Sequence, residues 1–148
     1  MSDSPQFSSH EQQVLRTIVG HIIPASAEYG MPGADDDLIF ADICHAARRE
    51  EAAIREAIAT VDRMSDGRFA GMDRAEQAQL LASFRTQYPL LARSCEIVTS
   101  RCYYRDDRVM LAIGMEARPP FPLGFKVEPG ELELLEPVRK RGKIYRDA

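Results

Sequence analysis

The chain has 148 residues, of which 45% are apolar and 28% are charged, and these proportions exclude extended disorder as its main state. Nineteen basic residues stand against 23 acidic ones, and the net charge of −4 argues against a protein held mainly by nucleic-acid phosphates. No run of residues approaches the ~18 apolar positions that a membrane-spanning helix needs.

Helical periodicity dominates the sequence up to about residue 114. The first predicted helix begins at Ser8 or Ser9, because Ser8 and Glu11 have the spacing of a capping box. It ends before Pro24, since the residue before a proline is disfavoured in a helix. Its apolar residues form one stripe: Val14, Leu15, Ile18, Val19 and Ile22. Residues 25–34, with two glycines and a proline, are predicted to form a loop.

The next two predicted helices follow that loop directly. The first begins at the acidic residues 35–37, because negative charge is favourable at a helix N-terminus, and it ends near Arg48 and Arg49. The second covers about residues 50–65, and Gly67 is the natural C-terminal cap for it.

Three further helices are predicted. One opens with a second capping box, formed by Asp73 and Glu76. The next begins near Pro89, a residue tolerated in the first turn of a helix, and a short last one covers about residues 107–113. The fold class is therefore predicted to be all-α, a compact bundle of five or six helices with a long, Pro-rich and largely irregular C-terminal arm.

The predicted domain organisation is a single domain over residues 1–148. Residues 1–7 are expected to be a flexible N-terminus, residues 8–116 the bundle, and residues 117–148 an extended arm that binds a partner. The arm is rich in proline, which favours an extended path. It is nevertheless too apolar for a solvated linker, and we expect it to lie on a protein surface. Its apolar residues are Phe121, Leu123, Phe125, Val127, Leu132, Leu134, Leu135, Val138, Ile144 and Tyr145.

The residues that could carry chemistry are few. Cys95 and Cys102 are seven positions apart on one predicted helix, a separation of ~10 Å that no disulfide spans, so we expect reduced cysteines. If the chain were an enzyme, its candidates would be Asp42, Cys44 and His45. On a helix, however, Cys44 and His45 point ~100° apart and cannot form a nucleophile–base pair. We therefore expect no catalytic, cofactor or metal site in this chain, and the residues favour a binding protein.

Several segments together resemble one protein family. The first helix ends in Ile22-Ile23-Pro24, and the arm begins with Arg118-Pro119-Pro120-Phe121-Pro122. With Tyr103-Tyr104-Arg105-Asp106 between them, these segments are similar to the gluconate 2-dehydrogenase subunit 3 family, over about residues 7–146. The resemblance implies a small, non-catalytic subunit. In such complexes a larger subunit of the glucose–methanol–choline (GMC) oxidoreductase type binds FAD and oxidises a sugar or alcohol, and a cytochrome subunit often accepts the electrons.

The resemblance leads us to expect an accessory subunit that binds and stabilises or matures such a flavoprotein. FAD is expected in the partner and no cofactor in this chain, with no binding to nucleic acid and no direct membrane insertion. The residues expected to contact the partner are Tyr103, Tyr104, Arg118, Pro119, Pro120, Phe121, Pro122, Phe125 and Tyr145.

Three alternatives stay open at this stage. Phe121 and Phe125 could pack on the protein's own helices. The chain could instead be a free-standing helical ligand-binding or regulatory module. The absence of a twin-arginine signal and the three cysteines lead us to expect a cytoplasmic location, the alternative being the periplasm by co-export with a signal-bearing partner.

Overall fold

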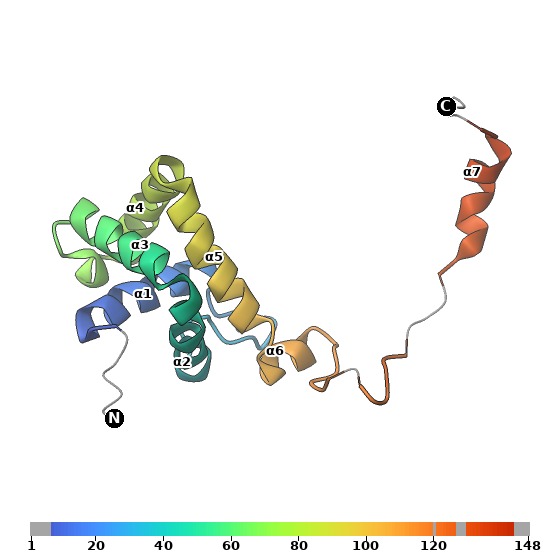
Figure 1. The fold of residues 1–148 in the computed structure, drawn as a ribbon, viewed down its shortest axis with the longest axis horizontal. Helices are drawn as coiled ribbons and strands as arrows, with labels where there is room; N and C mark the ends of the chain where they lie inside the picture. The colour runs from blue at the N-terminus through green and yellow to red at the C-terminus, as the bar shows by residue number, and fades with distance from the viewer. Residues whose placement is uncertain (1–6, 120, 127–129, 144–148) are drawn as a thin grey trace. The chain divides into compact units, whose positions relative to one another are not determined.

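The computed structural model describes residues 7–119, 121–126 and 130–143. By its internal contacts the chain divides into two units, Met1–Ala117 and Arg118–Ala148, and each is described by itself (Figure 1).

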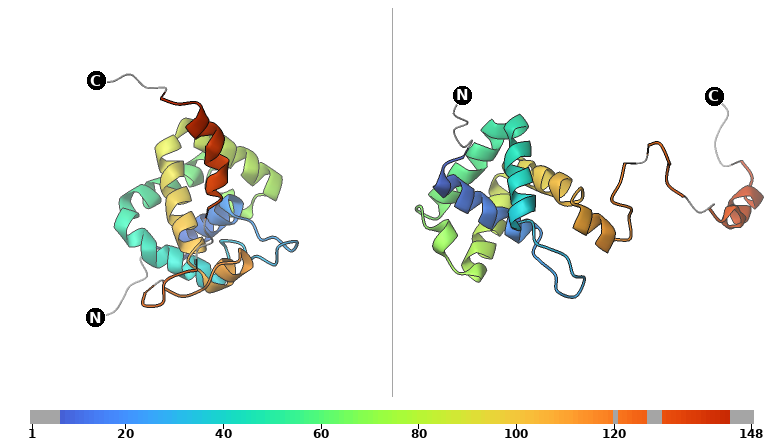
Figure 2. Two further views of the ribbon diagram at one scale, coloured as in Figure 1. Left: turned by 90° about the vertical axis from the view of Figure 1, so that its right-hand side faces the viewer. Right: turned by 90° about the horizontal axis from the view of Figure 1, so that it is seen from below.

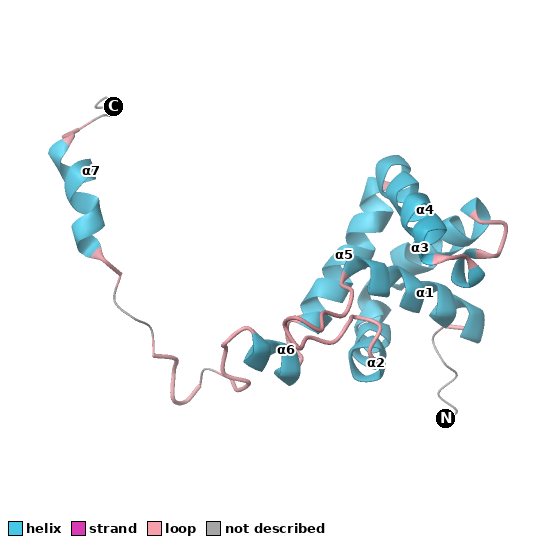
Figure 3. Ribbon diagram, turned by 180° about the vertical axis from the view of Figure 1, so that it is seen from behind, coloured by secondary structure: helices cyan, strands magenta, loops and turns pink. Residues whose placement is uncertain are grey.

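The first unit is a bundle of α-helices. They are α1 (Ser9–Ile22), α2 (Asp37–Ala46), α3 (Glu51–Met64), α4 (Arg74–Gln87), α5 (Pro89–Tyr103) and α6 (Asp107–Ala112), with short 3₁₀ turns η1 (Ala47–Glu50) and η2 (Phe69–Gly71). Within the described ranges no segment forms a strand (Figure 3). The all-α prediction is confirmed. None of the described helices is long and apolar enough to cross a membrane.

Both predicted capping boxes form. In α1 the amide of Glu11 donates to Oγ of Ser8 at 3.2 Å, and the amide of Ser8 donates back to the Glu11 carboxylate at 2.7 Å. In α4 the same exchange joins Asp73 and Glu76. Because each box satisfies backbone donors that a helix start leaves unpaired, the two helix starts are fixed by local sequence alone.

Helix α5 occupies the middle of the bundle. It packs against α1, α2, α3 and α4, and helices flank it on both sides in the turned views (Figure 2). The apolar stripe of α1 is buried from Val14 to Val19, as the periodicity predicted. Phe7, which we expected in the flexible N-terminus, is only 1% exposed and belongs to the core, because its ring directly precedes the cap of α1 and packs inward. Residues 1–6 lie outside the described part of the chain.

In the second unit, the described residues up to Glu131 form turns and irregular segments. The chain then forms a 3₁₀ turn, η3 (Leu132–Leu135), and a short helix, α7 (Glu136–Lys140). The arm was predicted to be largely irregular, and this short helical segment is an addition to that prediction. The helix continues because Pro137 lies in its first turn, where a proline costs no hydrogen bond.

Candidate functional site

The most conspicuous feature of the second unit is the exposure of its apolar side chains. Every residue that the structure describes from Pro119 to Lys143 is exposed. Phe121 is 85% and Leu123 81% exposed. The other exposed apolar side chains of this unit are Phe125, Leu132, Leu134, Leu135 and Val138. This unit, Arg118–Ala148, is the predicted arm without its first residue, and we keep the name arm for it.

Arg118 makes local contacts at the start of the arm. The guanidinium carbon of Arg118 lies 5.0 Å from the ring centroid of Phe125, a cation–π distance. Nη2 of Arg118 also donates to the carbonyl oxygen of Gly124 at 2.8 Å. Arg118 thus closes a turn that presents Phe121 and Leu123 between its two ends. Of the other predicted contact residues, Pro119 and Pro122 are exposed, whereas Pro120 and Tyr145 fall outside the described residues.

The arm is too short to cover these side chains itself. The unit Arg118–Ala148 spans 31 residues, and chains below about 40 residues rarely build a stable core without a disulfide, a metal or a partner. Because water exposure of large apolar groups is unfavourable, these side chains are suited to packing on a protein surface outside this unit.

The two tyrosines that were predicted to contact a partner differ in their surroundings. Tyr103 is 2% exposed and its hydroxyl donates to the carbonyl oxygen of Pro32 at 2.9 Å, so its side chain lies in the core of the first unit. Tyr104 is 55% exposed and packs edge-on against Tyr103, with 5.3 Å between ring centroids. Only Tyr104 therefore presents its ring at the surface.

The residues considered for an enzyme are placed unfavourably for catalysis. Nε of Arg105 donates to Oδ2 of Asp42 at 2.7 Å, and these hydrogen bonds lower the pKa of the Asp42 carboxyl. Burial raises the pKa of the half-buried Cys44 thiol, the opposite of what a thiolate nucleophile needs. None of the three cysteines, Cys44, Cys95 and Cys102, is in a disulfide.

The histidines and acidic residues form no metal centre in the part of the chain that the structure describes, where no three potential ligands gather. Nε2 of His21 lies 2.9 Å from Oε1 of Gln77, and the amide nitrogen of Gln77 donates to the carbonyl oxygens of Phe69 and Met72. Because an amide oxygen only accepts, Nε2 of His21 is the donor. The hydrogen bond from His21 to Gln77 therefore joins α1 to α4.

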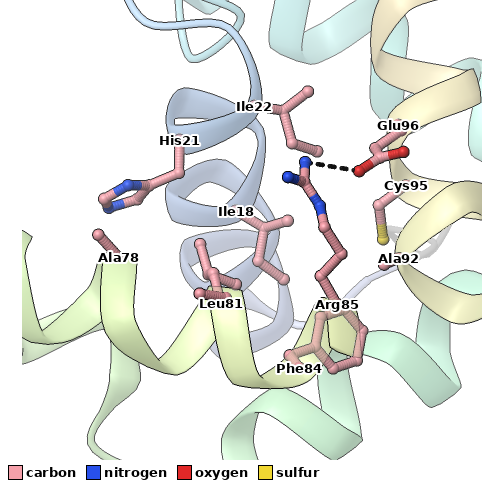
Figure 4. Close-up of a pocket in the computed structure, with 11 residues that line it drawn as sticks. Ile18, His21, Ile22, Ala78, Leu81, Phe84, Arg85, Ala92, Cys95 and Glu96 are labelled. Carbon is pink, nitrogen blue, oxygen red and sulfur yellow. Dashed lines mark hydrogen bonds and ion pairs between the residues drawn. The ribbon is translucent and has the colours of Figure 1, made fainter. Parts of the chain in front are cut away.

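One apolar pocket lies between α1, α4 and α5 (Figure 4). Its volume is about 200 Å³, and its lining includes the buried residues Ile18, Phe84 and Cys95. At its edge Nη2 of Arg85 lies 2.7 Å from the carboxylate of Glu96, joining α4 to α5. Sequence reasoning did not find this pocket, because its walls come from three helices whose mutual packing no local pattern encodes.

Comparison of the chain with protein-family models, with curated proteins and with solved structures found no match in any of the three.

Proposed function

We propose that this chain is a non-catalytic accessory subunit that binds and stabilises or matures a larger FAD-dependent dehydrogenase of the GMC type. The observation that supports it most is the exposure of the arm's apolar side chains, Phe121 and Leu123 above all. Aromatic side chains that enter pockets of a partner carry much of the energy of protein interfaces. The flavoprotein class of the partner comes from the family resemblance.

The arm supplies the contacts in this proposal. Phe121 and Phe125 are its aromatic anchors. Arg118 orients Phe125 through the cation–π contact between their side chains. Tyr104 is a further aromatic contact to the partner, on the surface of the first unit. Tyr103 is part of the core and contributes only through its ring contact with Tyr104.

The proposal is tested by purifying the tagged full-length chain from its native host. We expect a larger protein to co-purify at a fixed ratio and to show the visible absorption of a flavin. The isolated chain should have no dehydrogenase activity. A single colourless chain without a companion would contradict the proposal.

A matched pair of variants tests the role of the arm. Replacing Phe121 and Phe125 by serine should weaken the complex by at least ~30-fold for each anchor, since an interface anchor contributes about 2 kcal/mol or more. Replacing Leu38 and Leu111 by serine is the control, because both are exposed apolar residues of the first unit. Retention of the partner by the arm variant, or equal loss in the control, would contradict the assignment.

The pocket of Figure 4 favours a second candidate, a free-standing module that binds a small apolar ligand. Its volume of about 200 Å³ lies below the range of about 300–1,000 Å³ typical of small-molecule sites, so only a fragment-sized ligand fits and we rank this candidate second. Leu81→Trp would fill the pocket, and Gln79→Trp is a control on the exposed side of the same helix. A small molecule that co-purifies with wild type and the control but not with Leu81→Trp would favour this candidate.

A further inference from the structure

A different pocket, of about 430 Å³, lies where α2 and η1 meet the C-terminal end of α5. Its lining is almost entirely basic: His45, Ala46, Arg48, Arg49, Arg101 and Arg105. The protein as a whole has a net charge of −4, so this concentration of guanidinium groups does not follow from overall composition.

Two four-residue spacings bring these side chains together. His45 and Arg49 are four positions apart across the junction of α2 with η1, and Arg101 and Arg105 are four apart at the end of α5. Arg49 lies in the 3₁₀ turn η1 and Arg105 lies two residues past the end of α5, so each pair spans a helix end. Because α2 packs against α5, the two helix ends meet and these side chains line a common pocket.

Much of the hydrogen-bonding capacity of these arginines is unused. Among the described residues, the side chain of Arg49 has no hydrogen bond or ion pair, and the carboxylate of Glu50 lies 3.8 Å from Nη2 of Arg101, which is longer than a hydrogen bond. Nε and Nη2 of Arg105 donate to the carboxylate of Asp42, and Nη2 also donates to the sulfur of Cys102. Nη1 of Arg105 therefore remains available to a ligand. Three guanidinium groups therefore present donors to one pocket.

We propose that this pocket binds a phosphate-bearing small molecule through Arg49, Arg101 and Arg105. A guanidinium group offers planar, paired donors that match two oxygens of a phosphate, and such charge-assisted hydrogen bonds are about twice as strong as neutral ones. The volume of about 430 Å³ falls inside the range of about 300–1,000 Å³ found for small-molecule sites. All of its lining residues belong to the first unit, and the proposal is independent of the proposed accessory role.

Titration calorimetry of the full-length chain at fixed, near-physiological salt tests the proposal, with pyrophosphate as the probe and inorganic phosphate and citrate as comparisons. We expect saturable binding of pyrophosphate to one site, weaker binding of inorganic phosphate, and no comparable binding of citrate. Replacing Arg49 and Arg101 by alanine should weaken pyrophosphate binding at least tenfold. Arg49→Ala alone, which removes a side chain without a described partner, should weaken it without altering the thermal unfolding temperature.

The control replaces Arg68 and Arg74 by alanine. Both are exposed and lie beyond the opposite end of α3, a helix of 14 residues and therefore ~21 Å long. Absence of saturable pyrophosphate binding, or equal losses in the control and the pocket variant, would overturn the proposal. Citrate binding as tight as that of pyrophosphate would overturn the phosphate assignment, because it would show a response to charge alone.

Discussion

Nη2 of Arg108 lies 2.7 Å from Oδ1 of Asp36, a residue 72 positions earlier in the chain. Asp36 is the N-cap of α2, and Arg108 also pairs at 3.0 Å with Asp106, the N-cap of α6. One guanidinium group thus joins the capping carboxylates of two helices. This contact fixes α6 at the edge of the bundle.

Arg108→Gln should lower the free energy of unfolding at neutral pH and make it less sensitive to acid. The hydrogen bonds from Arg108 hold the pKa values of Asp36 and Asp106 below their usual value of 3.8. A lowered folded-state pKa contributes stability that is complete above the unfolded-state pKa and is lost as the pH falls through the folded-state pKa. The difference in the free energy of unfolding between wild type and Arg108→Gln should therefore be largest near neutral pH and shrink below about pH 4.

Urea unfolding at a series of pH values measures this difference. Arg74→Gln serves as the control, because Arg74 is an exposed residue that makes no ion pair with any residue the structure describes. A difference between wild type and Arg108→Gln that stays constant down to about pH 2 would show that the carboxylates do not mediate the effect.

Tyr103→Phe should destabilise the first unit by about 1 kcal/mol, the usual contribution of a hydrogen bond between protein groups. The hydroxyl of Tyr103 donates to the carbonyl oxygen of Pro32 at 2.9 Å, which ties the end of α5 to the loop before α2. Tyr104→Phe, at an exposed ring, should leave the free energy of unfolding almost unchanged. Equal effects of the two substitutions in urea unfolding would contradict the role of this hydrogen bond.

The helices were predictable because their signals are local. The capping boxes at Ser8 and Asp73 and the apolar stripe of α1 each depend on residues within a few positions of one another, and all are confirmed. Gly67 also helps to close α3, with φ of 75° and its amide bonded to the carbonyl oxygen of Asp62, but the C-cap residue itself is Ser65.

The sites were less predictable because they depend on contacts between distant segments. The pair Tyr103-Tyr104 marks a helix end, but only the packing of α5 against the loop that contains Pro32 decides which ring is buried. The arginines at 49 and 101 likewise meet only once α2 and α5 are packed. Arg49 is four residues from His45, and Arg101 is four residues from Arg105. The recurrence of this spacing of basic residues at two predicted helix ends is the sequence signal that could have indicated the pocket.

Gly67→Ala should destabilise the protein by about 1 kcal/mol, because Gly67 has φ of 75° and a side chain disfavours this left-handed conformation. The amide of Gly67 donates to the carbonyl oxygen of Asp62 at 2.9 Å, which closes the end of α3. Gly71→Ala is a matched control, since Gly71 has no positive φ and a Cβ there meets nothing within 4 Å. Thermal or urea unfolding measures both, and a neutral Gly67→Ala would contradict the conformational requirement.

The three thiols should differ in their rate of modification. Burial raises the pKa of Cys95 to about 12 and that of Cys102 to about 11, so near neutral pH fewer than about one in a thousand of these thiols is ionised and reactive. Cys44 is only half-buried and should react first with a thiol reagent. In denaturant all three should react quickly.

Cys44→Ser should remove the early phase of labelling and leave only the slow phase, whose rate follows the opening of the core. Fast labelling of Cys95 or Cys102 in the folded Cys44→Ser variant would contradict the buried, protonated state that we assign to them.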